Sequence, residues 1–285
     1  MPYLGLIFNA MVWGLSWWPL RQLQGLGLHP LWATTIFFLL GGVLIVAWQP
    51  VALRELRRSK ALWCLALAAG GTNAAFNWAV SIGDVVRVVL LFYLMPLWAV
   101  LLARWILGER LTRWALVRIV LALSGAVLVL KPAHAPWPVF AGLPDVLAVL
   151  GGMGFALNNV LLRQQARQSA SARALAMFAG GVVLPGLLAW ALSSHGMITP
   201  WPAWDWSWVL GALALGLAVF GANLALQYGA SRVPVHISSV VMLTEIPFAA
   251  GSSIWLAGSV LTPTIAMGGG LIMLAAMLAT QEGGQ

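Results

Sequence analysis

The chain has 285 residues, of which 15 are Lys or Arg and 7 are Asp or Glu. A soluble chain of this length carries about a quarter charged residues, roughly 70, so the composition excludes an ordinary soluble globular protein. Apolar residues make up 61% of the chain, and its mean hydropathy is +0.92. They fall in runs of about 17 to 22 residues rather than in the alternating pattern of a membrane β-barrel, which predicts an all-α, polytopic membrane protein.

Ten apolar runs, bounded by charges, Gly or Pro, are long enough to cross a bilayer as helices. They cover residues 3–20, 31–48, 61–81, 86–106, 114–130, 145–163, 173–192, 207–228, 235–256 and 261–280. Ten such spans leave no room for a soluble domain. The first run begins at Tyr3 without a basic region before it or a small-residue cleavage site after it, so we expect a span and not a signal peptide.

The basic residues lie in short clusters between the apolar runs. When the spans alternate in direction, 12 of the 15 Lys and Arg fall on one side, and Arg21, Arg87 and Lys131 fall on the other. The positive-inside rule then places both termini in the cytoplasm of a bacterial-type inner (plasma) membrane. Clusters of this kind are typical of loops at a membrane surface, so the net charge of +8 does not indicate nucleic-acid binding. Cys64 is the only cysteine, which excludes a disulfide and a thiolate metal site.

Four short motifs of the first half return in the same order in the second half, shifted by 140 to 151 residues. The pairs are Trp13-Gly14 with Met153-Gly154, Asn73-x-x-x-Asn77-Trp78 with Asn223-x-x-x-Gln227-Tyr228, Met95-Pro96 with Ile246-Pro247, and Gly108-x-x-Leu111-Thr112 with Gly258-x-x-Leu261-Thr262. They predict a duplication into residues 1–138 and 139–285. Because each copy has five spans, the second must enter the membrane from the opposite face, as in alternating-access transporters.

Glu245 is the one acid predicted near the bilayer midplane, about ten residues into its span. Pro247 follows it and should free the carbonyl of Leu243, just as Pro96 should free that of Phe92. Two interrupted helices at matching places in the repeats indicate a transport site. The alternative is that each proline only kinks its helix and that Glu245 bonds to a neighbouring hydroxyl.

Amide side chains occur in pairs spaced four residues apart, so each pair shares a helix face. Asn73 and Asn77 lie toward the outer end of the third span, and Asn223 and Gln227 lie toward the inner end of the eighth. The inverted repeat places one pair at each mouth of a pathway. Hydrogen bonds between helices would explain these amides equally well.

Several aromatic residues are predicted at similar depth. Trp13, Ser16 and Trp17 share one face of the first span, and further aromatic surface comes from Trp78, Phe92, Tyr93 and Tyr228. They could bind the apolar part of a substrate, although aromatic residues at helical spacing more often serve packing.

Four other polar residues have local interpretations. Asn158 and Asn159 lie deeper toward the cytoplasm and could line a gate or bridge helices. Asp84 and Arg87 are three residues apart at the start of a helix, which predicts a local ion pair.

The sequence contains no phosphate-binding loop, no His-Glu-x-x-His, no Gly-x-Ser-x-Gly and no pair of intramembrane aspartates, which argues against an enzyme. It also lacks the rings of charge and the polar loop of an ion-selective pore. We expect no cofactor and no metal.

Three of these features together resemble the drug/metabolite transporter superfamily in its ten-helix EamA branch. They are Trp13-Gly14, the segment from Asn73 to Ala79, and Pro96 followed by Leu107-Gly108-Glu109-Arg110-Leu111-Thr112. The resemblance covers nearly the whole chain and is greatest to the YddG-type aromatic amino-acid exporters. It implies a central cavity among spans one to four and six to nine, with spans five and ten at the periphery.

The resemblance implies a secondary transporter that exports or exchanges aromatic or neutral amino acids, or related small metabolites, across the inner membrane. Alternatives are a transporter of other drugs or metabolites and a passive channel. The predicted substrate site comprises Trp13, Ser16, Trp17, Asn73, Asn77, Trp78, Tyr93, Pro96, Asn223, Gln227, Tyr228, Glu245 and Pro247. The expected partners are a small-molecule substrate and the lipid bilayer, with the chain a monomer or weak dimer and no nucleic acid bound.

Overall fold

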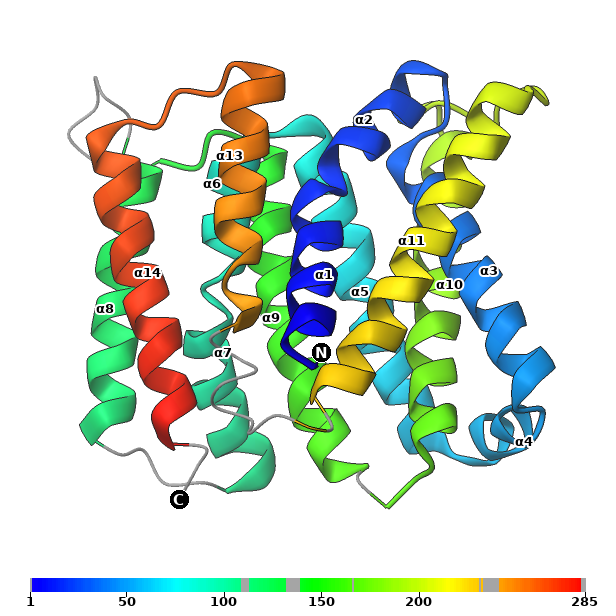
Figure 1. Ribbon diagram of the computed structural model, residues 1–285, viewed down its shortest axis with the longest axis horizontal. Coiled ribbons are helices and arrows are strands. Elements are labelled where there is room, and N and C mark those ends of the chain that lie inside the picture. The colour runs from blue at the N-terminus through cyan, green and yellow to red at the C-terminus, as the bar shows by residue number, and fades with distance from the viewer. Residues whose placement is uncertain are drawn as a thin grey trace.

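The computed structural model describes residues 2–108, 113–131, 139–165, 167–230, 232 and 241–282. Every regular element in these ranges is a helix, which confirms the predicted all-α class (Figure 1). The elements are α1 (Pro2–Leu15), α2 (Trp17–Gly25), α3 (Pro30–Trp48), α4 (Val51–Arg58), α5 (Lys60–Ile82), α6 (Val85–Phe92), α7 (Met95–Leu102), the π-helix η1 (Ala103–Leu107), α8 (Arg113–Leu130), α9 (Leu143–Gln164), α10 (Ala170–Ser194), α11 (Trp206–Ala230), α13 (Glu245–Ala257) and α14 (Pro263–Glu282).

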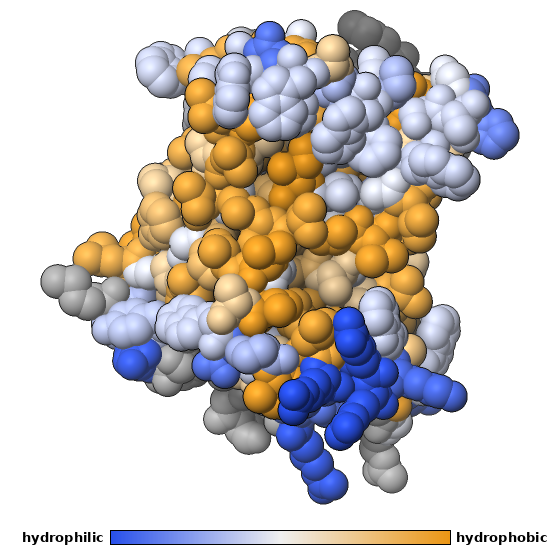
Figure 2. Space-filling view, turned by 90° about the vertical axis from the view of Figure 1, so that its right-hand side faces the viewer, coloured by the Kyte–Doolittle hydropathy of each residue, from blue (hydrophilic) through white to orange (hydrophobic). Residues whose placement is uncertain are grey.

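All ten predicted spans coincide with one or more of these helices, although the span 235–256 is described only from residue 241. Among the described residues, six helical ranges are long and apolar enough to cross a membrane. They are Pro30–Trp48, Val85–Ile106, Arg113–Leu130, Leu143–Leu162, Ala170–Ser194 and Trp206–Leu226. Figure 2 shows an apolar belt between two more hydrophilic rims. The chain is therefore a polytopic helical membrane protein.

Two local features differ from the prediction. The first span is not one helix, because a turn at Ser16 separates α1 from α2. The loop between the second and third spans contains the short helix α4, in which Ala52 and Leu56 are buried at i and i+4. They pack in a cluster with Leu62 of α5 and Leu175 of α10. These two buried side chains therefore hold α4 against α5 and α10.

Glycines allow pairs of helices to approach closely. A Cβ atom on Gly125 of α8 would lie 2.6 Å from the carbonyl oxygen of Gly268 on α14, and one on Gly268 would lie 2.7 Å from that of Gly125. Small residues at such a crossing permit the backbone contact that drives helix association in membranes. Helices α8 and α14, the fifth and tenth spans, pair at one edge of the bundle, the periphery that the resemblance implied (Figure 1).

The predicted ion pair between Asp84 and Arg87 is wrong. Asp84 caps α6 by accepting a 2.8 Å hydrogen bond from the backbone N–H of Arg87, the usual role of Asp at this position. The guanidinium of Arg87 instead pairs at 2.7 Å with Asp145 of α9 and donates to the carbonyl of Val129 at the end of α8. Arg87 therefore joins three helices at one end of the bundle.

The topology gives a testable prediction. Arg54, Arg57, Arg58 and Lys60 are exposed and lie in or directly after α4, the short helix between the second and third spans. In a Cys64→Ser background, we expect Arg57→Cys to react with a membrane-impermeant thiol reagent only after the cells are opened, because basic loops face the cytoplasm. Trp204 lies in the loop between α10 and α11, which the positive-inside rule places on the other side of the membrane. Trp204→Cys should therefore react in intact cells. Labelling of Arg57→Cys in intact cells would reverse the orientation.

Candidate functional site

Within the described ranges, three helical spans are interrupted, and each interruption is followed by a proline. The turns fall at Ser16 between α1 and α2, at residues 93–94 between α6 and α7, and at residues 243–244 before α13. The prolines are Pro19, Pro96 and Pro247, each within the first three residues of the next helix. A helix has no acceptor for its first N–H groups, so proline is tolerated there without loss of a hydrogen bond.

This placement changes the interpretation of the two carbonyls that were predicted to be free. The carbonyl of Leu243 accepts a 3.1 Å hydrogen bond from Ile246, so that part of the prediction is wrong. The carbonyl of Phe92 faces Gly152 of α9, where a Cβ atom would lie only 2.3 Å from the oxygen. The interruptions therefore allow close helix contact and do not leave two open carbonyls.

The turn at residues 93–94 is joined to the start of α13, directly after the turn at residues 243–244, by a side-chain contact. The hydroxyl of Tyr93 donates a 2.9 Å hydrogen bond to Oε2 of Glu245 and lies 3.4 Å from the carbonyl of Met242. Tyr93 is 3% and Glu245 is 8% exposed. Glu245 begins α13, where free backbone N–H groups favour a negative group. We refer to Tyr93 and Glu245 together as the polar bridge.

The interrupted first span packs against the same helix. The indole N–H of Trp17 donates a 3.0 Å hydrogen bond to the hydroxyl of Ser252 on α13. One turn earlier, a Cβ atom on Gly14 would lie 2.7 Å from the carbonyl oxygen of Glu245, so α1 touches the first turn of α13. All three interrupted spans thus meet around the polar bridge.

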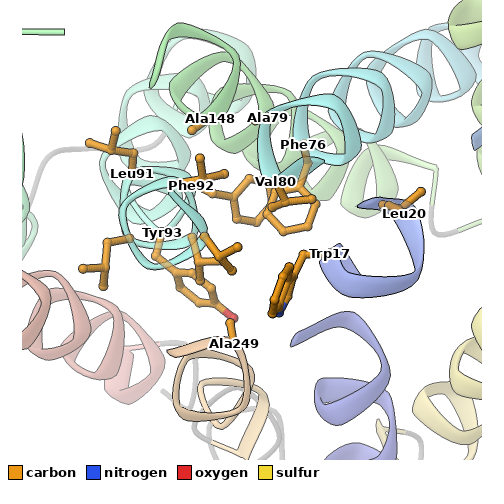
Figure 3. Close-up of a cluster of buried hydrophobic side chains, with 14 of the residues drawn as sticks. Trp17, Leu20, Phe76, Ala79, Val80, Leu91, Phe92, Tyr93, Ala148 and Ala249 are labelled. Carbon is orange, nitrogen blue, oxygen red and sulfur yellow. The ribbon is translucent and has the colours of Figure 1, made fainter. Parts of the chain in front are cut away.

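Aromatic side chains surround this meeting point (Figure 3). The ring of Phe92 lies 4.6 Å from that of Phe76 on α5, 5.6 Å from that of Phe155 on α9 and 6.0 Å from that of Tyr93. Figure 3 shows Trp17 and Tyr93 facing one another, with the Tyr93 hydroxyl directed toward α13. The site is a buried acid and a phenol within an apolar, aromatic wall, which suits an amphipathic cation or a proton.

The amide nitrogens of the first half donate hydrogen bonds within the bundle, although the Oδ1 of Asn77 has no partner among the described residues. Asn77 is 1% exposed and its Nδ2 donates to the hydroxyl of Thr34 on α3 at 3.1 Å. Asn73 donates to the carbonyl of Ala69, four residues back in its own helix. The interhelical alternative therefore explains Asn77 directly, and Thr34 is the partner that the sequence did not indicate.

Asn223 has a different environment from Asn73, its repeat counterpart. Its Nδ2 also donates to a carbonyl of its own helix, that of Val219. However, Asn223 lines an open groove of about 240 Å³ between the inner ends of α3, α10 and α11. The remaining lining residues are Ile45, Trp48, Gln49, Ala170, Ser171, Ala174, Phe178, Phe220 and Leu224.

The other end of the bundle is packed. Leu31, Ala74 and Ala189 form a buried cluster with Trp32 and Trp78 against it. The ring of Trp32 contacts that of Trp201, and His29 contacts Trp78 at 5.3 Å. Burial lowers the pKa of His29 to about 4, and its Nδ1 accepts a hydrogen bond from the backbone of Leu31.

The remaining predicted site residues lie around the bridge or outside it. Trp13 packs against the main core, and Ser16 donates to the carbonyl of Trp13. Pro247 and Tyr228 are exposed, and Arg232 lies over the Tyr228 ring at 4.0 Å, so the prediction that they contact a buried substrate is not supported by their positions. The side chains of Pro96 and Gln227 lie outside the described residues.

No group of three His, Cys, Asp or Glu side chains in the described ranges is placed to hold a metal ion.

Comparison with known proteins relates the first part of the chain to a family of membrane proteins. Residues 1–131 match the EamA-like transporter family model, a stretch that includes Trp17 and Tyr93 but not Glu245. Comparison with curated proteins returns no match.

A solved protein structure, described only as the crystal structure of a protein, is similar over 99% of this chain and 96% of that chain. Its TM-score is 0.63 and its sequence identity is 20%, which is a similarity of fold. The protein is therefore a helical, multi-pass membrane protein whose first 131 residues are similar to EamA-like transporters.

The prolines after the interruptions can be tested by substitution. In Pro96→Ala or Pro247→Ala, the new N–H could bond to the carbonyl four residues earlier and let a continuous helix form across the turn. We expect several-fold slower transport with unchanged folded yield. Pro185→Ala, inside the continuous helix α10, is the matched control. Full turnover of both test variants would show that the turns have no part in transport.

His29 gives a prediction about stability. Because folding lowers its pKa from 6.5 to about 4, its stabilising contribution is complete above pH 6.5 and is lost as the pH falls toward 4. His29→Asn keeps a capping oxygen but removes the titration. We expect a flatter dependence of the Tm of the purified protein on pH between 6.5 and 4 in this variant. An identical dependence in both proteins would refute this role.

Proposed function

We propose that the protein is a secondary transporter that exports or exchanges amino acids, aromatic or neutral, or closely related small metabolites, by alternating access. The observation that carries the proposal is the polar bridge, a buried hydrogen bond between the interruptions of two spans. A charged or polar group inside a membrane is costly and usually marks a substrate or ion pathway. Transporters place such sites where discontinuous helices meet.

The duplication into residues 1–138 and 139–285 is part of this proposal. The polar bridge joins one residue of each half, and the helix turns on which they lie precede the motif partners Pro96 and Pro247. A site formed at the interface of two inverted copies can be exposed to either side when one copy moves against the other. The similarity of residues 1–131 to EamA-like transporters supports a transporter of small molecules.

The two ends of the bundle differ in a way that supports alternating access. The end containing Trp32 and Trp78 is packed, whereas the groove beside Asn223 is open. We assign the packed end to the periplasmic side and the groove to the cytoplasmic side, in accordance with the positive-inside rule. This assignment agrees with an inner-membrane exporter that has both termini in the cytoplasm and acts as a monomer or weak dimer.

The bridge suggests how an amino acid or amine is bound. The carboxylate of Glu245 meets the substrate ammonium, with the phenol of Tyr93 as a second hydrogen-bonding group, while Phe92 and Trp17 enclose the apolar part. In the alternative role, Glu245 carries a proton that is exchanged for substrate.

Counterflow in proteoliposomes tests the class of transport. Unlabelled substrate inside the vesicles should accelerate uptake of labelled substrate, because a carrier returns faster when loaded. A panel of amino acids and amines identifies the substrate. A channel would give no such acceleration, and its absence across the panel would refute a carrier of this substrate class.

Glu245→Gln separates the two roles of the acid. The change keeps size and hydrogen bonding but removes the charge. If Glu245 couples transport to protons, the variant should still exchange substrate but lose its response to a pH gradient. If Glu245 contacts the substrate, the affinity for cationic amines should fall by about tenfold or more at every pH.

Glu55→Gln is the matched control, since Glu55 lies on α4 and accepts a hydrogen bond from Ser169 far from the bridge. It should behave like the unmodified protein in both assays. Unchanged affinity and an unchanged pH response in Glu245→Gln would make Glu245 a structural acid and would remove the central residue of the proposal.

A further inference from the structure

Arg21 of α2 is one of the three basic residues predicted on the outer side, and its guanidinium is bound within the protein. Its Nε donates a 3.3 Å hydrogen bond to the carbonyl of Val80, and its Nη2 donates to the carbonyl of Gly83. Both carbonyls lie at the C-terminal end of α5, where a helix has carbonyls to spare and favours a positive group. Asp84, the next residue, adds an electrostatic attraction. Arg21 therefore ties α2 to α5.

The end of α5 to which Arg21 bonds is tightly packed. A Cβ atom on Gly83 would lie 2.5 Å from the Cβ of Pro144, the second residue of α9. The guanidinium of Arg21 also lies over the indole of Trp17, 4.9 Å from the ring centroid, which is a favourable contact between a cation and an aromatic ring. Arg21 thus holds the Trp17 ring as well as the helix that carries it.

The indole of Trp17 connects α2 to the second half of the chain. Its N–H donates the 3.0 Å hydrogen bond to the hydroxyl of Ser252, which follows Glu245 by seven residues, about 10.5 Å along α13. Figure 1 shows α2 and the final turns of α13 at the same end of the bundle. Trp17 is 2% exposed. Its indole therefore lies between the polar bridge and the packed end that we assigned to the periplasm.

The two connections of α2 cannot both persist when one half moves against the other, because α5 belongs to the first half and α13 to the second. Arg21 makes two hydrogen bonds from a charged donor, and such bonds are stronger than neutral ones. Trp17 makes one neutral hydrogen bond to Ser252, so this contact is the weaker of the two. The turn at Ser16 separates α2 from α1, which lets α2 stay on α5 while its contact with α13 breaks.

We propose that Trp17 and Ser252 form the outer gate of the transporter, and that Arg21 is the positioning residue that keeps Trp17 in the closed place. The inference rests on the proposed function, because a gate requires a carrier with two states of access. Release of substrate to the outside then breaks the hydrogen bond between Trp17 and Ser252, while Arg21 keeps α2 on the first half.

The test follows access to the site from both sides of the membrane. In a Cys64→Ser background, Ala249→Cys reports the outer side, because Ala249 is 1% exposed and lies three residues before Ser252 on α13. Asn223→Cys reports the inner groove. A membrane-impermeant thiol reagent is applied to intact cells for the first reporter and to inside-out vesicles for the second. Ser252→Cys, a nearly isosteric change, replaces Ala249→Cys as the outer reporter if that variant does not fold.

The two partners of the gate are changed one at a time. Ser252→Ala removes the acceptor, and Trp17→Phe removes the donor but keeps an aromatic ring. In each variant we expect the outer reporter to react about two- to tenfold faster, the effect of losing one neutral hydrogen bond. The rate at Asn223→Cys should stay equal or fall, because the population moves toward the outward form.

Arg21 is tested with two substitutions. Arg21→Met removes both hydrogen bonds to α5 and should also accelerate labelling of the outer reporter. Arg21→Lys should restore closure only in part, because an ammonium lacks the planar fork that bonds two carbonyls at once. The matched controls are Gln22→Met, at the exposed neighbour of Arg21 on α2, and Ser194→Ala, at an exposed hydroxyl that donates to a carbonyl of its own helix. Both controls should leave the two labelling rates unchanged.

The outcomes separate a gate from a structural contact and from the carrier itself. Unchanged labelling of the outer reporter in Ser252→Ala and Trp17→Phe would refute the gate. Faster labelling of both reporters would show a loosened fold and would also overturn the proposal. A selective rise at the outer reporter without counterflow of any amino acid or amine would retain the gate and refute the carrier of this substrate class. Counterflow with unchanged labelling would retain the carrier and refute the gate.

Discussion

The hydrogen bond between Tyr93 and Glu245 is the interaction on which the rest of the structure depends. In the interior of a membrane protein, a carboxyl group without a partner is far less favourable than in water. Tyr93 can reach Glu245 only because both lie at helix interruptions that face each other. The turns, the prolines that follow them and the aromatic wall around Phe92 all determine the position of this one contact.

Close backbone contact is the second requirement of this arrangement. Gly14 lets α1 touch the first turn of α13, and Gly152 lets α9 touch the last residue of α6. Any larger residue at either position would push a helix away from the turn that it supports.

Much of this could be predicted from the sequence, because membrane spans follow from the length and composition of apolar runs. The ranges 61–81 and 114–130 each differ by one residue at most from the ends of α5 and α8. Pro96 and Pro247 correctly indicated interrupted spans. Their exact effect was predicted less well, since sequence does not tell a proline inside a helix from one in its first turn.

Side-chain partners were the part that the sequence could not supply. Arg87 has an acid three residues before it, yet it pairs with Asp145, which is 58 residues away. The choice depends on which helices become neighbours, and periodicity does not contain that information.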